Sequence, residues 1–141
     1  SSIFNNINFN NIKLDNVDIV DVIFNNSDLS NQVFDNKLLS RVVFNNCKLL
    51  GTSFVNSNLK DIKFNNSNCK YINLFSSSLT NIEIIDSTFN ETEFIKTNLK
   101  DIDFSSCNIE RIIFDIDSLK GIKINVLQAS DIVRLLEVQI K

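Results

Sequence analysis

The chain has 141 residues, of which 43% are apolar, and this composition fits one globular domain. A formal charge of −3 gives no sign of electrostatic binding to nucleic acid or to anionic lipid. No apolar run approaches the roughly 20 residues of a membrane span. Three cysteines, Cys47, Cys69 and Cys107, lack CxxC spacing, which argues against a disulfide framework or a zinc site, so a reducing cytoplasm is the expected location.

An apolar residue returns at every fifth position from Phe4 to Ile124, and none of these 25 positions is polar. A period of five suits neither a helix, with its spacing near 3.6, nor a strand, with its spacing of 2. This pattern favours a solenoid whose stacked coils bury one continuous core. The interval of 20 residues per coil comes from a recurring Phe-Asn-Asn triplet, which starts at Phe4, Phe24, Phe44 and Phe64. Stacking would place Asn5, Asn25, Asn45 and Asn65 in an amide ladder.

Around each Phe or Leu centre, position −2 is small or β-branched and position −1 is often polar. This pattern resembles that of the pentapeptide-repeat proteins, and the units at Ser57–Asp61 and Thr97–Asp101 are close to the usual unit of that family. The resemblance covers about residues 2–125. It implies an all-β solenoid, a right-handed four-sided β-helix of about six coils. We therefore expect a β-helix over 1–125 and a C-terminal capping helix and tail over 126–141.

Position +2 is the predicted corner of each side, where the backbone needs a positive φ. Glycine is common there in the family, but asparagine dominates in this chain, because its short amide tolerates the left-handed region and bonds locally. Both glycines, Gly51 and Gly121, also fall on +2. The asparagines at this position are Asn6, Asn11, Asn16, Asn26, Asn31, Asn36, Asn46, Asn56, Asn66 and Asn81.

The first 30 residues enter the coil without a capping helix, so the first coil presents an open edge. Either the chain was cut there or another subunit covers the edge. The absence of Met indicates a trimmed or processed product. Gln32 and Lys37 occupy inward −2 positions, and since a buried unpaired Lys is unfavourable we expect a local bulge that exposes it, with a ligand site as the alternative.

Two columns of apolar residues on outward positions predict a contact surface, because stacked exposed apolar side chains are less usual than scattered ones. One column lies at position +1 and the other at −1 near the open edge. Their members are Val55, Phe75 and Ile95 in the first and Ile3, Ile23 and Val43 in the second.

After Ile124 the period changes to that of an amphipathic helix of about 12 residues. Asn125 is the predicted N-cap, with Gln128 as its capping-box partner. The apolar positions that follow are Ala129, Ile132, Val133 and Leu136. Val138 and Ile140 alternate with polar neighbours and fit a short edge strand at a subunit contact.

No catalytic, cofactor-binding or metal-binding residue is indicated. The chain has no His and no glycine-rich phosphate loop, and no serine has a recognisable base. Glu83 and Asp103 share a column and form a possible carboxylate pair. The simpler interpretation is a solvated face, with Lys63 and Lys123 in the same column. The cysteines are interpreted as core thiols.

The predicted function is a non-enzymatic protein-interaction or scaffold module with a protein partner of unspecified identity, no direct nucleic-acid binding and no membrane. A homodimer is expected, through Asn125–Lys141 or, as the rival, through the open N-terminal edge. The family suggests an alternative: some of its members confer quinolone resistance and are thought to imitate DNA when they bind DNA gyrase or topoisomerase IV. Duplex DNA carries one charge per about 1.7 Å, a density that a net charge of −3 does not approach.

Overall fold

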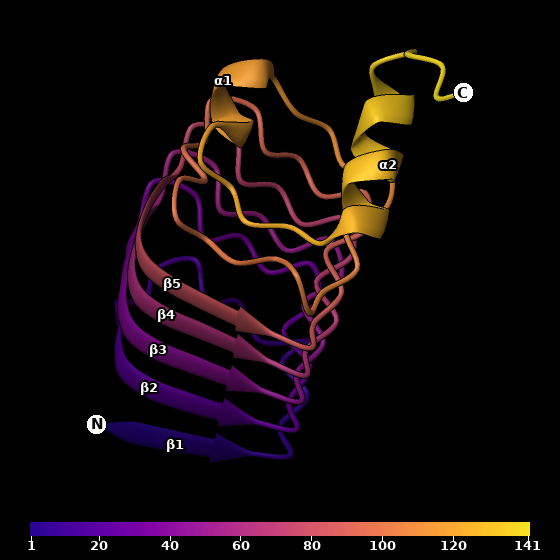
Figure 1. The fold of residues 1–141 in the computed structure, drawn as a ribbon. Coiled ribbons are helices and arrows are strands. Elements are labelled where there is room, and N and C mark those ends of the chain that lie inside the picture. Colours follow the sequence, from indigo (N-terminus) through magenta and orange to yellow (C-terminus); the bar gives the residue numbers. More distant parts are fainter.

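A computed structural model describes residues 1–141, which form a β-helix with a helix at its C-terminal end (Figure 1). Five strands stack in sequence order into one parallel sheet on the near side of the solenoid. Isolated bridges such as Asp28↔Lys48 and Val33↔Ser53 mark the other sides of the coils. The predicted right-handed, four-sided β-helix of about six coils is confirmed. The strands are β1 (Ser2–Asn5), β2 (Ile19–Asn25), β3 (Leu38–Asn45), β4 (Asn58–Asn65) and β5 (Ser78–Ile85).

Successive strands pair with a register of 20 residues, so that identical side chains stack. Phe24 lies against Phe44 with ring centroids 5.4 Å apart, and Phe44 lies 5.1 Å from Phe64. The predicted amide ladder is present: the Nδ2 of Asn45 donates to Oδ1 of Asn25 at 2.9 Å, and Asn65 donates to Asn45 at 2.9 Å. These columns tie each coil to the next through both core and surface.

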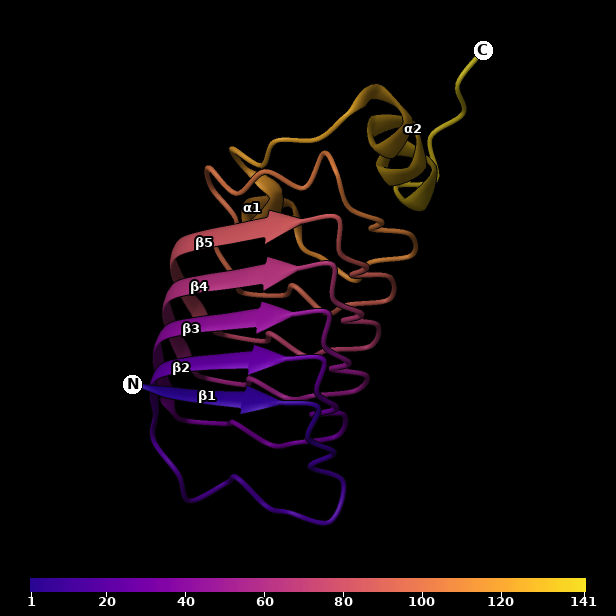
Figure 2. The same cartoon turned by 90° about the horizontal axis from the view of Figure 1, so that it is seen from below.

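The corners adopt the predicted backbone conformation over most of the chain. Every +2 residue from Asp21 to Asp101 has a positive φ, including Gly51 at 66°. Asn11, Asn16, Ser106 and Ile116 do not, so the corner prediction is wrong at these four positions. Asn11 and Asn16 lie in the first coil, where the loop between β1 and β2 swings away from the stack (Figure 2).

Small residues at position −2 form a buried hydroxyl ladder between coils. The Oγ1 of Thr52 donates to the carbonyl oxygen of Leu29 at 2.9 Å, and the hydroxyl of Ser57 donates to that of Phe34. Ser67, Ser77, Ser87, Thr92 and Thr97 repeat the pattern with a carbonyl 23 residues earlier. Because each hydroxyl has a partner, the narrow sides of the coil hold polar groups without an unsatisfied atom.

The bulge expected at Gln32 and Lys37 is absent. Their strand positions keep the regular register, since the N–H of Asn36 donates to the carbonyl oxygen of Val55 at 2.9 Å and that of Asn58 donates to Lys37 at 2.8 Å. Lys37 is half-buried instead of exposed, and Gln32 is buried. The irregularity lies one coil lower, where the first coil departs from the stack and the amide of Gln32 reaches across to it.

The C-terminal end carries two helices, α1 (Ile116–Leu119), which the sequence did not predict, and α2 (Val126–Leu135). The predicted capping box is confirmed: Asn125 accepts from the N–H of Gln128 at 2.9 Å, and the Gln128 side chain accepts from the N–H of Asn125 at 2.9 Å. Ile132 joins the core, so α2 does cap the last coil, but it stands over one side and projects beyond the stack (Figure 1).

Candidate protein-contact surfaces

Exposed apolar side chains gather at the two ends of the rod. Seventeen large apolar residues are exposed, and only Tyr71 and Ile85 of these lie between residues 39 and 112. Scattered exposed residues need no explanation, but a concentration at the ends does. We define the C-terminal surface by Ile113, Ile116, Val126, Leu127, Leu135, Leu136, Val138 and Ile140.

The C-terminal surface includes the most exposed apolar residues of the chain. Val126 and Leu127 in the first turn of α2 are 85% and 80% exposed, and the sequence reasoning missed both. Leu127 lies outside the helical spacing of the apolar face that begins at Ala129, and that offset was the available signal, whereas Val126 lies three residues before Ala129 and fits that spacing. Val138 and Ile140, which were predicted for a subunit contact, are 53% and 60% exposed. Leu136 was placed on the inward face, yet it is exposed because α2 projects past the last coil.

The −1 column runs inward from the open edge of β1. Ile3 pairs with Ile23, and Ile23 pairs with Val43, so the predicted column exists as a stack. Ile3 is exposed, whereas the other two are half-buried. Ile23 and Val43 line a groove of about 340 Å³ on the outer face of the sheet, beside the Asp21–Arg41 ion pair. This column is therefore apolar at the open edge, and the charged side chains of Asp21 and Arg41 lie beside it in the next coils.

The +1 column stacks as predicted, but its side chains are only half-buried rather than freely exposed. The N–H of Asn56 donates to the carbonyl oxygen of Phe75 at 3.0 Å, and that of Ser76 donates to Ile95 at 3.1 Å, which holds Val55, Phe75 and Ile95 in line. The Nζ of Lys96 lies 5.6 Å from the centre of the Phe75 ring, so a cation covers part of the column.

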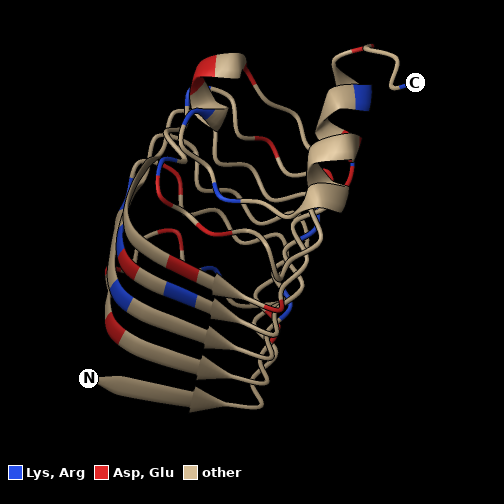
Figure 3. Cartoon of the chain, viewed as in Figure 1, with Lys and Arg blue, Asp and Glu red and all other residues tan.

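Ion pairs of opposite sign link neighbouring coils along the sides of the rod. Arg41 pairs with Asp21, Lys63 with Glu83 at 3.4 Å, and Arg111 with Glu91 at 2.8 Å. Positive and negative residues consequently alternate up the stack (Figure 3). The hydrogen bond from Arg41 lowers the pKa of the Asp21 carboxyl, and that from Arg111 lowers the pKa of Glu91. No continuous acidic stripe follows from this arrangement.

The predicted pair of carboxylates does not form a site. Glu83 binds Lys63, while Asp103 accepts from the N–H of Ser105 at 2.9 Å, and hydrogen bonds from Ser105 lower the pKa of its carboxyl. No group of three or more His, Cys, Asp or Glu residues is placed to hold a metal ion. The three cysteines are buried and unbonded to one another. Neither helix has the length and apolar character needed to cross a membrane.

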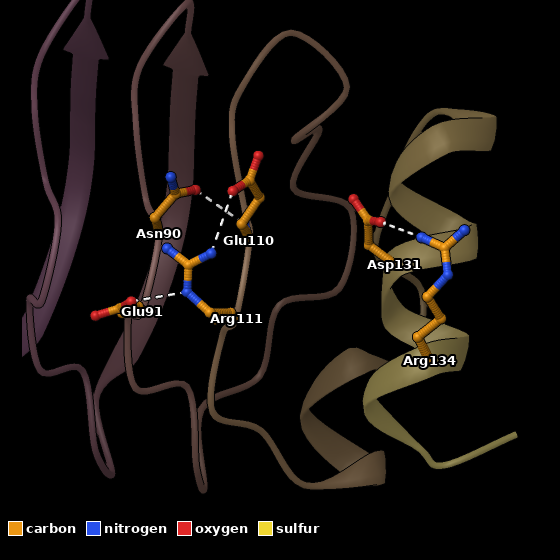
Figure 4. Close-up of polar contacts among 6 residues, drawn as sticks. All are labelled: Asn90, Glu91, Glu110, Arg111, Asp131 and Arg134. Carbon is orange, nitrogen blue, oxygen red and sulfur yellow. Dashed lines mark hydrogen bonds and ion pairs between the residues drawn. The ribbon is translucent and has the colours of Figure 1, made fainter.

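Charged residues of the last coils and of α2 meet beside the C-terminal surface (Figure 4). The guanidinium of Arg111 lies between Glu91 and Glu110, and Arg134 binds Asp131 at 2.9 Å on α2. A hollow of about 270 Å³ separates the two pairs and is also lined by Leu135. The hollow places paired charges next to the apolar Leu135, and a charged border beside apolar residues is typical of the edge of a protein contact.

The fold and its repeated units define a class of solenoid protein. The family described as "Pentapeptide repeat region" matches residues 1–74 and 17–94, which together span more than half of the chain. The chain therefore belongs to the pentapeptide-repeat family.

Several solved structures have a similar arrangement at low sequence identity. QnrB1, a plasmid-mediated fluoroquinolone resistance protein, is 17% identical, with 99% of this chain and 87% of that chain covered and a TM-score of 0.35. Rfr23, a pentapeptide repeat protein from the cyanobacterium Cyanothece 51142, is 14% identical over 89% of this chain and 86% of its own, with a TM-score of 0.40. HetL from Nostoc sp. strain PCC 7120 is 9% identical over 86% and 84%, with a TM-score of 0.38. No curated protein matches this chain.

Proposed function

We propose that this protein is a non-enzymatic protein-interaction module and that its C-terminal surface binds a second copy of the chain. The observation that carries the proposal is the concentration of exposed apolar residues there, with Val126 and Leu127 at 85% and 80% exposure. Burying a side chain of this kind contributes roughly 1.5–3 kcal/mol, so a few of them suffice for a stable contact. A closed twofold arrangement is the commonest way to bury such a surface.

The C-terminal surface is favoured over the N-terminal edge by its composition. Its residues Val126 and Leu127 are 85% and 80% exposed, more than any apolar residue near the N-terminus, and the Arg111 and Arg134 ion pairs lie at its rim. Contacts between proteins generally combine an apolar centre with a polar rim. The N-terminal edge, with Ile3 61% exposed, is the rival contact.

The body of the rod supports a scaffold role. Its amide ladder, phenylalanine stacks and hydroxyl ladder tie the coils of β1 to β4 to one another, so this part of the rod would hold its exposed faces in a fixed arrangement. A second candidate for a protein contact is the column of Val55, Phe75 and Ile95. Because these side chains are half-buried, they offer less apolar surface and would form a weaker contact.

The DNA-imitating alternative has less support from the charges. Asp21 and Glu91 are paired with arginines from the adjacent coil, which compensates their charge, although Asp61 and Asp101 in the column of Asp21 have no ion pair. Imitation of duplex DNA needs about one negative charge per 1.7 Å along the rod. This alternative predicts altered supercoiling by DNA gyrase at micromolar protein, and an unchanged reaction would exclude it.

Chemical cross-linking of two matched triple variants tests the proposal. The variant Leu127→Ser, Val138→Ser, Ile140→Ser removes exposed residues of the C-terminal surface, and we expect it to lose the cross-linked dimer. The control variant Val55→Ser, Phe75→Ser, Ile95→Ser changes the +1 column and should retain it. Circular dichroism of both variants checks that the β-helix is intact. A dimer that survives in the first variant and disappears in the second would overturn the assignment.

A further inference from the structure

One side of the solenoid is open between β5 and the coil above it. No backbone hydrogen bond joins β5 to residues 98–105, although the 20-residue register continues through both. At the equivalent position one coil lower, the N–H of Ser78 donates to the carbonyl oxygen of Ser57 at 2.9 Å. We call this gap in the pairing the seam, and the residues above it, 98–141, the C-terminal cap.

The other sides of the same two coils remain paired. The N–H of Phe89 donates to the carbonyl oxygen of Asn108 at 2.7 Å, and that of Phe94 donates to Ile113 at 2.7 Å. Above the seam the ladder resumes, with the N–H of Phe104 donating to Lys123 at 2.9 Å. Backbone hydrogen bonds thus join the cap to the coil below on the far sides of the solenoid but not along β5. This arrangement is the geometry of a hinge.

The sequence explains why the seam falls here. The triplet Phe-Asn-Asn that builds the columns of β1 to β4 is replaced at the end of β5 by Ile84, Ile85 and Asp86. The phenylalanine stack and the amide ladder therefore both end in β4, at Phe64 and Asn65.

The core beneath the seam is also packed differently. Phe64 contacts Phe89 edge-on at 5.6 Å, and Phe89 contacts Phe104 edge-on at 6.0 Å, in place of the parallel stack below. Leu79 and Ile82 in β5 are only partly buried, whereas the equivalent Leu59 and Ile62 in β4 are 1% and 0% exposed. Leu79 and Ile82 thus lack part of the cover that the register would give them, although Leu99 and Ile102 above the seam are buried at 0% and 5% exposure.

We propose that the seam is a conformational joint, at which the C-terminal cap moves between this open position and a closed one in which residues 98–105 pair with β5. The closed position restores backbone bonds from Leu79, Asn81 and Ile84 in the same register as the lower coils. The cap carries the C-terminal surface. A molecule that binds the cap in one position only would therefore shift the equilibrium between the open and closed positions. The joint itself does not depend on whether that molecule is a second copy.

Amide hydrogen exchange on the intact chain tests the open position. We expect the amides of Leu79, Asn81 and Ile84 to exchange at least about tenfold faster than those of Leu59, Asp61 and Phe64, their counterparts one coil lower. Equal protection of the two sets would overturn the proposal. The variant Ile85→Asn, Ser105→Asn carries the amide ladder across the seam, and it should slow exchange at the three β5 amides.

Disulfide trapping tests the closed position. Thr80 and Lys100 are exposed and occupy the same column on either side of the seam, and a disulfide between them needs Cα atoms within about 7 Å. Thr80→Cys, Lys100→Cys should form the bond slowly but completely. The control Lys60→Cys, Thr80→Cys bridges the paired strands β4 and β5 and should form it at once. If no disulfide forms across the seam, the gap is fixed. If the disulfide forms as fast as in the control, residues 98–105 already pair with β5. Either result would contradict the proposed joint.

Discussion

Gln32 and Gln128 lie near opposite ends of the rod, and each binds backbone groups of the neighbouring coil with the same arrangement of hydrogen bonds. The Nε2 of Gln32 donates to the carbonyl oxygens of Phe9 at 2.9 Å and Ile12 at 2.7 Å, and that of Gln128 donates to Phe104 at 2.8 Å and Cys107 at 2.6 Å. In both cases the acceptors are three residues apart in the coil that the glutamine covers. Each Oε1 also accepts one backbone N–H. The long amide thus replaces backbone pairing where a regular coil ends.

Replacing Gln32 by Ala should destabilise the protein, because the change removes three hydrogen bonds from buried or half-buried backbone groups. A typical unsatisfied buried group costs about 1–3 kcal/mol, so we expect a loss of at least about 2 kcal/mol in the free energy of unfolding. Urea unfolding followed by circular dichroism measures the loss. The exposed Gln139 provides a matched control, since Gln139→Ala should change little. A Gln32→Ala variant as stable as the control would contradict this role.

The amide ladder makes a second prediction about stability. Asn45 donates to Asn25 and accepts from Asn65, so Asn45→Ala removes two rungs, whereas Asn5→Ala removes only the terminal one. We expect Asn45→Ala to cost about 1–2 kcal/mol and Asn5→Ala less than half of that. Thermal unfolding of both variants gives the comparison. Equal losses at the two positions would show that the ladder does not act as a stack.

The buried thiols should be unreactive in the folded chain. Burial raises the pKa of Cys69 well above the usual thiol value, and burial also raises those of Cys47 and Cys107. The thiolate is the reactive form, so a thiol reagent at pH 8 should label none of the three before unfolding and all of them in denaturant. Rapid labelling of any cysteine in the folded protein would place that thiol at the surface.

The inter-coil ion pairs predict a loss of stability in acid. The pKa of Asp21 and of Glu91 lies below the usual value because an arginine donates to each carboxyl, so the folded chain releases these protons more readily than the unfolded chain. Their contribution is present above the unfolded pKa and is lost as the pH falls through the folded one, below about pH 4.

The midpoint temperature Tm should therefore be constant near neutral pH and fall in acid. The variant Arg41→Gln removes the partner of Asp21 and should fall less steeply than the parent chain over the acid range. Lys13→Gln, which changes a lysine without an ion pair, should keep the parent profile. An unchanged acid slope in Arg41→Gln would contradict the contribution of that pair.

The regular part of the fold could be predicted because a period of five and an interval of 20 determine which residues stack. The amide ladder, the corners from Asp21 to Asp101 and the capping box at Asn125 all follow from residue type at a fixed position. The departures depend on packing between coils. Nothing local to Asn11 or Asn16 indicates that the first coil leaves the stack, and the expected bulge at Gln32 fails because its amide finds carbonyl partners one coil below.

The contact surfaces were predictable only in part. Val138 and Ile140 alternate with polar residues and are exposed, but the exposure of Val126 and Leu127 depends on how α2 stands on the last coil. The half-buried state of Val55, Phe75 and Ile95 likewise depends on neighbours such as Lys96, which sequence position does not reveal.

Molar mass by light scattering over a range of protein concentrations tests the central claim, that the C-terminal surface binds a second copy, most directly. The full chain should have twice the mass of 16.1 kDa, and the chain truncated after Glu137, which lacks Val138 and Ile140, should have the monomer mass with an unchanged β-helix spectrum. A truncated chain that stays dimeric would show that Val138 and Ile140 are not needed, and would leave Val126 and Leu127 of α2 or Ile3 of the N-terminal edge as the contact. A full chain that is monomeric at high concentration would contradict the claim.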